Sequence, residues 1–412
     1  MNKSPRLVAL ETLYSIFYDG SYSNIALDNA LSDIKENKAF ISALVYGVTE
    51  RKITLDYFID KYAQGRIKPK VRIVLWLGAY QLLFMEKVPS SASINESVKL
   101  VKEIKQDYYS KLVNAVLHKI DNDRQIPDDL SVKYSVPENL INMWKKQYGE
   151  DVLNEFLPCI NDKPPLFAIP NKKFVNSDEL LYELECDGIL GEAYDEFVLI
   201  ENANDLTDSK AFKNGLFYIE DLSSFNCANA LDALSDDLVL DMCSAPGGKA
   251  FTISQSMNNS GKIYCYDLHE HRLNLIKSSA KRLSIDNIYT DVNDATVYNE
   301  NIPKADKILC DVPCSGFGII RRKPEIRYKD LDSVKDLPQI QYKILETSSR
   351  YLKDGGRIIY STCTLNKKEN ENVVNKFLKD HSGYKLLKDK TVFPSTVGGD
   401  GFYYAIMVKN EN

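Results

Sequence analysis

Two cysteines are the side chains of this sequence best placed to do chemistry. Cys314 lies in DVPCSGFG, at the end of the apolar run KADKILCDV, and Cys363 lies in STCT, directly after GGRIIY. Both runs have the composition of buried strands. Because parallel strands end at a common edge of their sheet, we expect the two thiols to share one site there. A thiolate is a nucleophile that forms transient covalent bonds with a substrate.

Methylation at carbon 5 of a pyrimidine ring is a reaction that needs such a thiol. Carbon 5 is a poor nucleophile until a cysteine adds to carbon 6 and makes carbon 5 enamine-like. The cysteine must later leave by elimination, which a second group can assist. Asp311, if it carries or shares a proton, can hydrogen-bond to N3 of the base and favour the adduct. An enzyme that methylates an amino group would instead carry an Asn/Asp-Pro-Pro-aromatic loop, which DVPC does not match.

A glycine-containing loop, Cys243-Ser-Ala-Pro-Gly-Gly-Lys249, connects the apolar run LVLDM to a helical pattern that starts near Phe251. Adjacent glycines at a strand-to-helix turn let the backbone approach a ligand, and the helix start offers free N–H groups. The loop lacks the GxxxxGK[ST] of a P-loop and the GxGxxG of a dinucleotide site. It therefore favours the short glycine loop of a methyltransferase.

Two acidic residues follow the next strands of the pattern. Asp267 ends KIYCYDL, where a carboxylate can accept hydrogen bonds from both ribose hydroxyls of a nucleoside. Asp294 follows DNIYTDV and could lie near an adenine ring. Either acid alone is often no more than a helix cap. Their order along the strands favours a nucleoside-containing cofactor.

The elements that must position these residues alternate in the second half of the chain. Apolar β-rich runs follow helical ones in the order LVLDM, KIYCYDL, DNIYTDV, KADKILCDV, GGRIIYSTC and FYYAIMVK. This alternation predicts an open, mainly parallel α/β sheet of the Rossmann-like kind. Upstream, apolar residues recur at helical spacing to about Ile120, which predicts an all-helical domain. We predict three domains: an all-α domain over 1–127, a small α+β connector over 128–210 and a methyltransferase over 211–412.

The overall composition is that of a globular chain. It has 412 residues, of which 44% are hydrophobic and 27% charged. The longest apolar stretch, Ile73–Phe84, is shorter than the roughly 18 residues that a membrane span needs. The eight cysteines are scattered, with no CxxC pair and no Cys/His cluster, which argues against a disulfide framework and a structural metal site. We expect a cytoplasmic protein with no membrane segment and no bound metal.

Basic residues gather in the amino-terminal part, although the whole chain carries a formal charge of -6. Residues 1–127 hold 18 Lys and Arg against 14 Asp and Glu, a net charge of +4. The densest run, KYAQGRIKPKVR, contains Arg66, Lys68 and Lys70 and no acid. This run could contact an RNA backbone. A solvated helix end would show the same composition.

Four segments resemble a known family. DMCSAPGGK, DVPCSGFGIIRRKPEIR, YSTCTLNKKENENVV and DGFYYAIMVK look like the RNA 5-methylcytosine methyltransferases of the Nol1/Nop2/Sun type, over about residues 210–412. The helical part, from SPRLVALETLYSIF to LVNAVLHKI, is similar to the NusB-like domain of bacterial 16S ribosomal RNA cytosine methyltransferases, the Sun/Fmu/RsmB group. Where that family often has two acids before an asparagine, this chain has Lys368 and Glu369.

The resemblance implies a division of labour between the cysteines. Cys363 of the TC motif would be the nucleophile, Cys314 of the PC motif would aid release, and the substrate would be 16S ribosomal RNA. The methyl donor would be S-adenosylmethionine. The residues that would contact it are Cys243, Ser244, Ala245, Pro246, Gly247, Gly248, Lys249, Asp267, Asp294 and Asp311. The RNA backbone would pass Arg321, Arg322 and Lys323. By analogy, a NusB-like domain fused to an enzyme is expected in a monomer.

Two other functions fit the same sequence. The same chemistry could act on transfer RNA or on another ribosomal site, because base choice depends on surface shape. Alternatively, the chain could be a NusB-like RNA-binding or transcription-partner protein with a vestigial methyltransferase fold. The complete loops around both cysteines argue against this second alternative.

Overall fold

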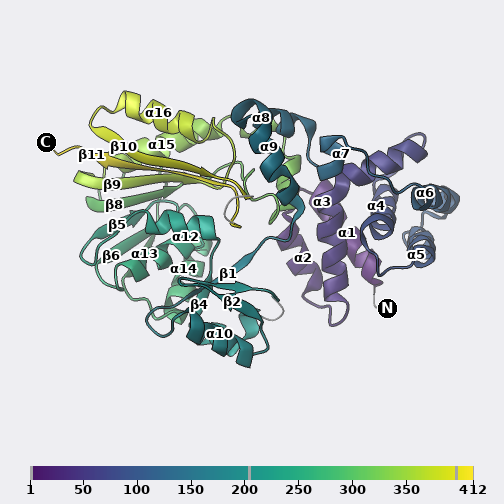
Figure 1. The fold of residues 1–412 in the computed structure, drawn as a ribbon, viewed down its shortest axis with the longest axis horizontal. Coiled ribbons are helices and arrows are strands. Elements are labelled where there is room, and N and C mark those ends of the chain that lie inside the picture. Colours follow the sequence, from purple (N-terminus) through teal and green to yellow (C-terminus); the bar gives the residue numbers. More distant parts are fainter. Residues whose placement is uncertain (1–2, 203–205, 395–397, 412) are drawn as a thin grey trace. The chain divides into compact units, whose positions relative to one another are not determined.

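The computed structural model describes residues 3–202, 206–394 and 398–411. They form two compact units (Figure 1). The first takes in the chain up to Asp162 together with Ile320–Asp330. The second takes in Lys163–Ile319 and the chain from Leu331 onward. The predicted boundaries at 127 and 210, which follow sequence pattern alone, remain predictions.

The first unit is helical, as the apolar spacing predicts. Its helices are α1 (Pro5–Tyr18), α2 (Ser23–Leu31), α3 (Lys38–Tyr62), α4 (Pro69–Phe84), α5 (Ser90–Glu103), α6 (Ser110–Asn122), α7 (Leu130–Tyr134), α8 (Glu138–Tyr148) and α9 (Glu150–Phe156), with 3-10 turns η1 (Asp107–Tyr109), η2 (Leu157–Asn161) and η4 (Pro324–Tyr328). The chain enters α1 with Ser4, whose side chain accepts a hydrogen bond from Leu7 N, and with Pro5 in the first turn. The most apolar helix, α4, is buried along most of its length.

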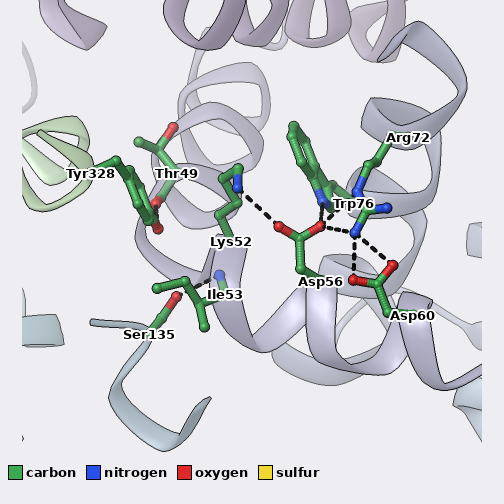
Figure 2. A network of polar contacts seen from close by, with 9 residues as sticks. All are labelled: Thr49, Lys52, Ile53, Asp56, Asp60, Arg72, Trp76, Ser135 and Tyr328. Carbon is green, nitrogen blue, oxygen red and sulfur yellow. Dashed lines mark hydrogen bonds and ion pairs between the residues drawn. The ribbon is translucent and has the colours of Figure 1, made fainter. Parts of the chain in front are cut away.

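A segment from late in the sequence, Ile320–Asp330, completes this helical unit. The Arg327 guanidinium is 1% exposed and donates to the carbonyl oxygen of Glu50 at 2.9 Å. The Tyr328 hydroxyl donates to the carbonyl oxygen of Thr49 at 2.7 Å, in the network that Figure 2 shows. The segment is therefore held by buried polar bonds as well as by packing.

The second unit is built on a seven-stranded mixed sheet with strand order β10-β11-β9-β8-β5-β6-β7. The strands are β5 (Leu238–Asp241), β6 (Lys262–Asp267), β7 (Ile288–Val292), β8 (Ala305–Asp311), β9 (Leu352–Thr362), β10 (Tyr384–Val392) and β11 (Phe402–Lys409). Strands β5 to β9 pair in parallel, and β10 and β11 pair antiparallel at one end. Each of the six predicted strands is present, and β10 is an additional strand.

Helices cover both faces of this sheet (Figure 1). They are α12 (Leu222–Asn229), α13 (Gly248–Ser256), α14 (Glu270–Arg282), α15 (Leu337–Ser349) and α16 (Glu371–Asp380), with a 3-10 turn η5 (Leu331–Val334). Successive side chains of a strand point to opposite faces. Accordingly, Val239 and Leu309 pack with α12, α13 and α14, whereas Leu240 and Ile308 pack with α15 and α16. Burial on both faces explains why β5 and β8 contain consecutive apolar residues rather than an alternation of apolar and polar ones.

A small antiparallel sheet of order β2-β3-β1-β4 belongs to the same unit. Its strands are β1 (Leu166–Pro170), β2 (Gly191–Ala193), β3 (Val198–Ile200) and β4 (Phe217–Ile219), accompanied by α10 (Ser177–Cys186), η3 (Leu206–Asp208) and α11 (Lys210–Lys213). Asn171, after β1, is 1% exposed and donates to the carbonyl oxygens of Gly215 and Leu283, which ties this sheet to α14. None of the helices in the described ranges is long and apolar enough to cross a membrane.

Candidate active site

The two cysteines meet at the carboxyl ends of β8 and β9. Their sulfur atoms lie 3.2 Å apart. The register of the parallel pair places Asp311 opposite Ser361, so the loops that follow both residues leave the sheet together. A second contact joins the loops, because Gly318 N donates to the Cys363 carbonyl oxygen at 3.0 Å. The structure thus brings together the two thiols that the sequence places at one sheet edge.

The Cys314 thiol is protonated at neutral pH. Its pKa is raised well above the ordinary value, first by the hydrogen bond with Cys363, then by burial and by the negative charges of nearby groups, Glu369 among them. A protonated thiol can donate a hydrogen bond to a neighbouring sulfur. Cys314 is therefore the donor of the pair when Cys363 carries a negative charge.

A cavity of about 380 Å³ lies at the ends of β5 and β8, and neither Cys314 nor Cys363 is among its lining residues. Asp311 is one of its walls and stands three residues before Cys314 in the chain. The predicted cofactor residues that line the cavity are Cys243, Ser244, Ala245, Pro246, Gly248, Lys249 and Asp311. Gly247, Asp267 and Asp294 are not among its lining residues.

The glycine loop reaches the cavity because its backbone takes a shape that side chains resist. Gly247 has φ 109°, in the left-handed region that favours glycine. Gly248 begins α13, and a Cβ atom there would come within 3.1 Å of the Glu220 carboxylate. Gly248 and Lys249, the first two residues of α13, line the cavity, and the cofactor contact that the loop pattern predicts for them stays a prediction.

A partly buried ion pair joins the loop to β8. Lys249 Nζ lies 2.8 Å from Asp311 Oδ2, and the Ser361 hydroxyl donates to Asp311 Oδ1 at 2.8 Å. Burial by itself would lower the pKa of Lys249, but the attraction of Asp311 and Glu220 outweighs burial and raises it. Lys249 is thus a fixed positive charge, and both Asp311 oxygens are engaged as acceptors.

Two acids of the cavity were not identified from the sequence. Asp241, the last residue of β5, is 1% exposed, and within the described part of the chain neither of its carboxylate oxygens has a hydrogen-bond partner. Burial raises the pKa of Asp241 to about 7. Burial also raises the pKa of Glu220 to about 7. The signal for Asp241 was present in LVLDM, where an acid ends the first strand as Asp267 ends the second.

Asp267 and Asp294 have local partners. Asp267 is buried, lies 2.8 Å from Arg272 Nη1 and accepts from His269 N at 3.1 Å. Asp294 is exposed and accepts from the backbone N–H and the hydroxyl of Thr296. Their predicted cofactor contacts stay predictions.

The predicted RNA-contacting residues all lie in the helical unit and differ in exposure. Arg66, Lys68 and Lys70 are exposed at and before the start of α4. Arg321 is only 6% exposed, and Arg322 and Lys323 are half-buried. The exposed three are the better placed to meet a phosphate backbone. No cluster of three or more His, Cys, Asp or Glu side chains suited to a metal ion occurs among the described residues.

Comparisons with known proteins match both units. The family model described as 16S rRNA methyltransferase RsmB/F matches residues 228–408, and the NusB family model matches residues 3–122. A probable ribosomal RNA small subunit methyltransferase B of Bacillus subtilis is 34% identical and covers 98% of this chain and 99% of its own length. The ribosomal RNA small subunit methyltransferase B of Photorhabdus laumondii is 28% identical over 98% of both chains. A methyltransferase homolog protein from Pyrococcus horikoshii has a TM-score of 0.60 and 26% identity, over 68% of this chain and 98% of that one.

Proposed function

The chain belongs to the ribosomal RNA small subunit methyltransferase B family, and on that premise we propose that it methylates carbon 5 of a cytosine in 16S ribosomal RNA through a covalent cysteine adduct. The observation that carries the proposal is the pair of thiols, 3.2 Å apart, on the loops that follow Asp311, which lines the cavity, and Ser361, which donates to Asp311. Methyl transfer to an amino nitrogen needs no covalent nucleophile, whereas transfer to carbon 5 does.

The residues of the cavity fit S-adenosylmethionine, which supplies the methyl group. Both Asp241 oxygens are buried acceptors without a partner in the described chain, and they suit the ammonium or hydroxyl donors of such a molecule. The glycine loop lets the start of α13 approach it, and the fixed charge of Lys249 suits a carboxylate. These residues would hold the cofactor at the ends of β5 and β8.

Cys363 is proposed as the nucleophile because it stands in the TC motif, to which the family resemblance gives the attack, and because Cys314 lies within hydrogen-bond distance to support it. The raised pKa of Cys314 leaves that thiol able to donate to the Cys363 sulfur and so to stabilise a thiolate there. The Cys363 thiolate adds to carbon 6 of the cytosine, and the electron pair of the C5–C6 double bond moves to carbon 5. Carbon 5 would then form the new bond to the methyl carbon as the bond between that carbon and the donor's sulfur breaks, its electron pair going to the sulfur.

Release reverses the addition. Carbon 5 now carries a hydrogen and the methyl group, so a base removes the proton and the C5–C6 double bond re-forms. The bond between carbon 6 and Cys363 breaks, and its electron pair returns to the sulfur. The Cys314 thiol can donate a hydrogen bond to that leaving sulfur, which lowers the barrier to release.

Cysteine variants test this division of labour. Cys363→Ala should lose turnover without forming an adduct, whereas Cys314→Ala should form a covalent RNA adduct that survives a denaturing gel. Cys186→Ala changes an exposed cysteine on α10 and is the matched control with unchanged turnover. If Cys314→Ala lost turnover without adduct and Cys363→Ala trapped one, the roles would be reversed. If neither variant trapped RNA, the proposed role of Cys314 in release would be refuted.

The substrate position is tested in the cell. Bisulfite sequencing of 16S ribosomal RNA from a strain without this protein should show one cytosine that has lost its methyl group. If a transfer RNA cytosine lost its methyl group instead, the same reaction would have transfer RNA as its substrate. Because ribosomal RNA is the proposed substrate, we propose the cytoplasm as the place of action. We also propose a monomer, which sedimentation of the free protein would test.

A further inference from the structure

Glu369 is a buried charged side chain close to the cysteines that the reaction above does not use. It lies between β9 and α16 and is 0% exposed. A carboxylate in such a place needs several donors to offset the loss of water. The donors it has are informative, because they come from the loops of both cysteines.

Four hydrogen bonds end on the Glu369 carboxylate. Oε1 accepts from the Ser315 hydroxyl at 2.6 Å and from Asn366 Nδ2 at 2.8 Å. Oε2 accepts from Ser315 N at 2.9 Å and from Gln341 Nε2 at 2.9 Å. Both polar groups of Ser315, the residue after Cys314, therefore point at one carboxylate. Gln341 adds a second tie, because it also donates to the carbonyl oxygen of Pro313, the residue before Cys314.

A directed chain of hydrogen bonds extends from Glu369 to the other cysteine loop. The Ser315 hydroxyl has one proton, which it donates to the carboxylate. In its 2.6 Å contact with the Thr364 hydroxyl, the Ser315 oxygen must therefore be the acceptor and Thr364 the donor. Thr364 directly follows Cys363. Its hydroxyl oxygen in turn accepts from Phe317 N at 3.3 Å. The carboxylate of Glu369 thus fixes the direction in which both hydroxyls, those of Ser315 and Thr364, point their protons.

The two cysteines depend on Glu369 to different degrees. Cys363 directly follows β9, which is held on both sides by β8 and β11. Cys314 lies in a loop beyond β8, and the residues on both sides of it are held by Glu369 or by Gln341, its partner. The loss of Glu369 should therefore free Cys314 more than Cys363.

We propose that Glu369 is a positioning residue that holds Cys314 against Cys363 for release of the methylated RNA. The proposal rests on the proposed function, in which Cys314 assists release. The negative charge of Glu369 also contributes to the raised pKa of Cys314, after the hydrogen bond with Cys363 and burial. The same carboxylate thus fixes the place of the thiol and helps to keep its proton.

Glu369→Gln tests the proposal with almost no change in volume. In either orientation the amide presents an N–H group to two of the four donors, and because only the Ser315 hydroxyl can turn to accept from it, at least one bond is lost. Turnover should fall by about tenfold or more, and the covalent RNA adduct should accumulate on a denaturing gel as with Cys314→Ala. Turnover at the wild-type rate would overturn the proposal, and so would lost turnover without any adduct in a folded variant.

Two further variants separate positioning from folding. Gln341→Met keeps Glu369 but removes its donor and the tie to Pro313, so it should accumulate adduct to a smaller extent; if it folds and accumulates none, the proposal is wrong. Asn287→Ala removes a buried side chain of the same unit that, among the described residues, bonds to Ser254 and Ser260, and it should lower the melting temperature without adduct.

The two proposals fail in different ways. If Cys314→Ala itself accumulates no adduct, the proposed division of labour fails whatever Glu369→Gln does. If Cys314→Ala accumulates adduct while folded Glu369→Gln does not, only the positioning role of Glu369 fails.

Discussion

Two aspartates, one in each unit, show how the protein treats charge in opposite ways. Asp56, on α3 of the helical unit, accepts from Lys52 Nζ at 2.9 Å, Arg72 Nε at 2.8 Å and Trp76 Nε1 at 2.7 Å (Figure 2). Asp241, at the end of β5, is more deeply buried and has no partner for either oxygen within the described residues. A carboxylate with three donors holds helices together. A carboxylate with none is costly to bury and is expected where a ligand brings the donors.

Arg327, a buried arginine of the helical unit, joins elements of that unit as Asp56 does. The Nη1 atom of Arg327 donates to the carbonyl oxygens of Glu50 and Ser135 and to Asn161 Oδ1. These acceptors come from three separate parts of the helical unit, which the segment Ile320–Asp330 therefore joins. Asp56 and the Nη1 group of Arg327 thus hold elements of their own unit together, whereas Asp241 at the cavity has two acceptor oxygens without a partner among the described residues.

Removal of Arg327 should have the largest effect on stability. Arg327→Met leaves several buried oxygen atoms without their donor and should lower the free energy of unfolding by about 4 kcal/mol. Both tryptophans of the chain, Trp76 and Trp144, lie in the helical unit, so their fluorescence in a urea titration reports on this unit. Lys133→Met, which removes an exposed cation from the same unit, is the control with little change. An equally small change for Arg327→Met would show that this segment does not hold the unit.

Asp241→Asn should stabilise the protein and weaken its cofactor site. The pKa of Asp241 is raised to about 7 in the fold, above its ordinary value in the unfolded chain, so ionisation of this carboxyl opposes folding as the pH rises. Replacement by the neutral amide should add about 2 kcal/mol at pH 8, with the gain shrinking as the pH falls towards 4, close to the ordinary pKa of an aspartate.

Calorimetry gives the readouts for Asp241→Asn. Thermal unfolding scans between pH 4 and 8 measure the gain, and titration with S-adenosylmethionine should show weaker binding. A variant that is less stable at pH 8, or that binds the cofactor as wild type does, would contradict the contrast with Asp56.

The parts of the structure that the sequence predicted are those with a local signal. The glycine loop and the two cysteine loops each follow an apolar strand, and the parallel order of those strands brings the loops together. The strand β10 was missed because its sequence, YKLLKDKTV, is rich in lysine. It is the edge strand of the sheet, where exposed charges are expected and an apolar pattern is not.

The parts that escaped prediction depend on contacts between distant residues. Glu369 is only an acid in a loop until Ser315, 54 positions away, is seen to donate to it twice. The segment that contains Arg327 follows the Cys314 loop in sequence, and nothing in RRKPEIR indicates that it completes a helical unit. No periodicity encodes such pairings, because both members are polar and their spacing is irregular.

The smallest effect on stability is expected for Asp56→Asn, which makes at Asp56 the same exchange as Asp241→Asn. The amide can still accept from Arg72 and Trp76 through its oxygen, but its nitrogen then faces Lys52, so the free energy of unfolding should fall by about 1 kcal/mol. Because Trp76 donates directly to this side chain, its emission should also shift. High salt should reduce the effect, since these groups are partly exposed. The same Asp→Asn exchange should thus lower stability in the helical unit and raise it at the cavity, and a change of equal sign at both positions would remove the distinction between paired and ligand-ready carboxylates.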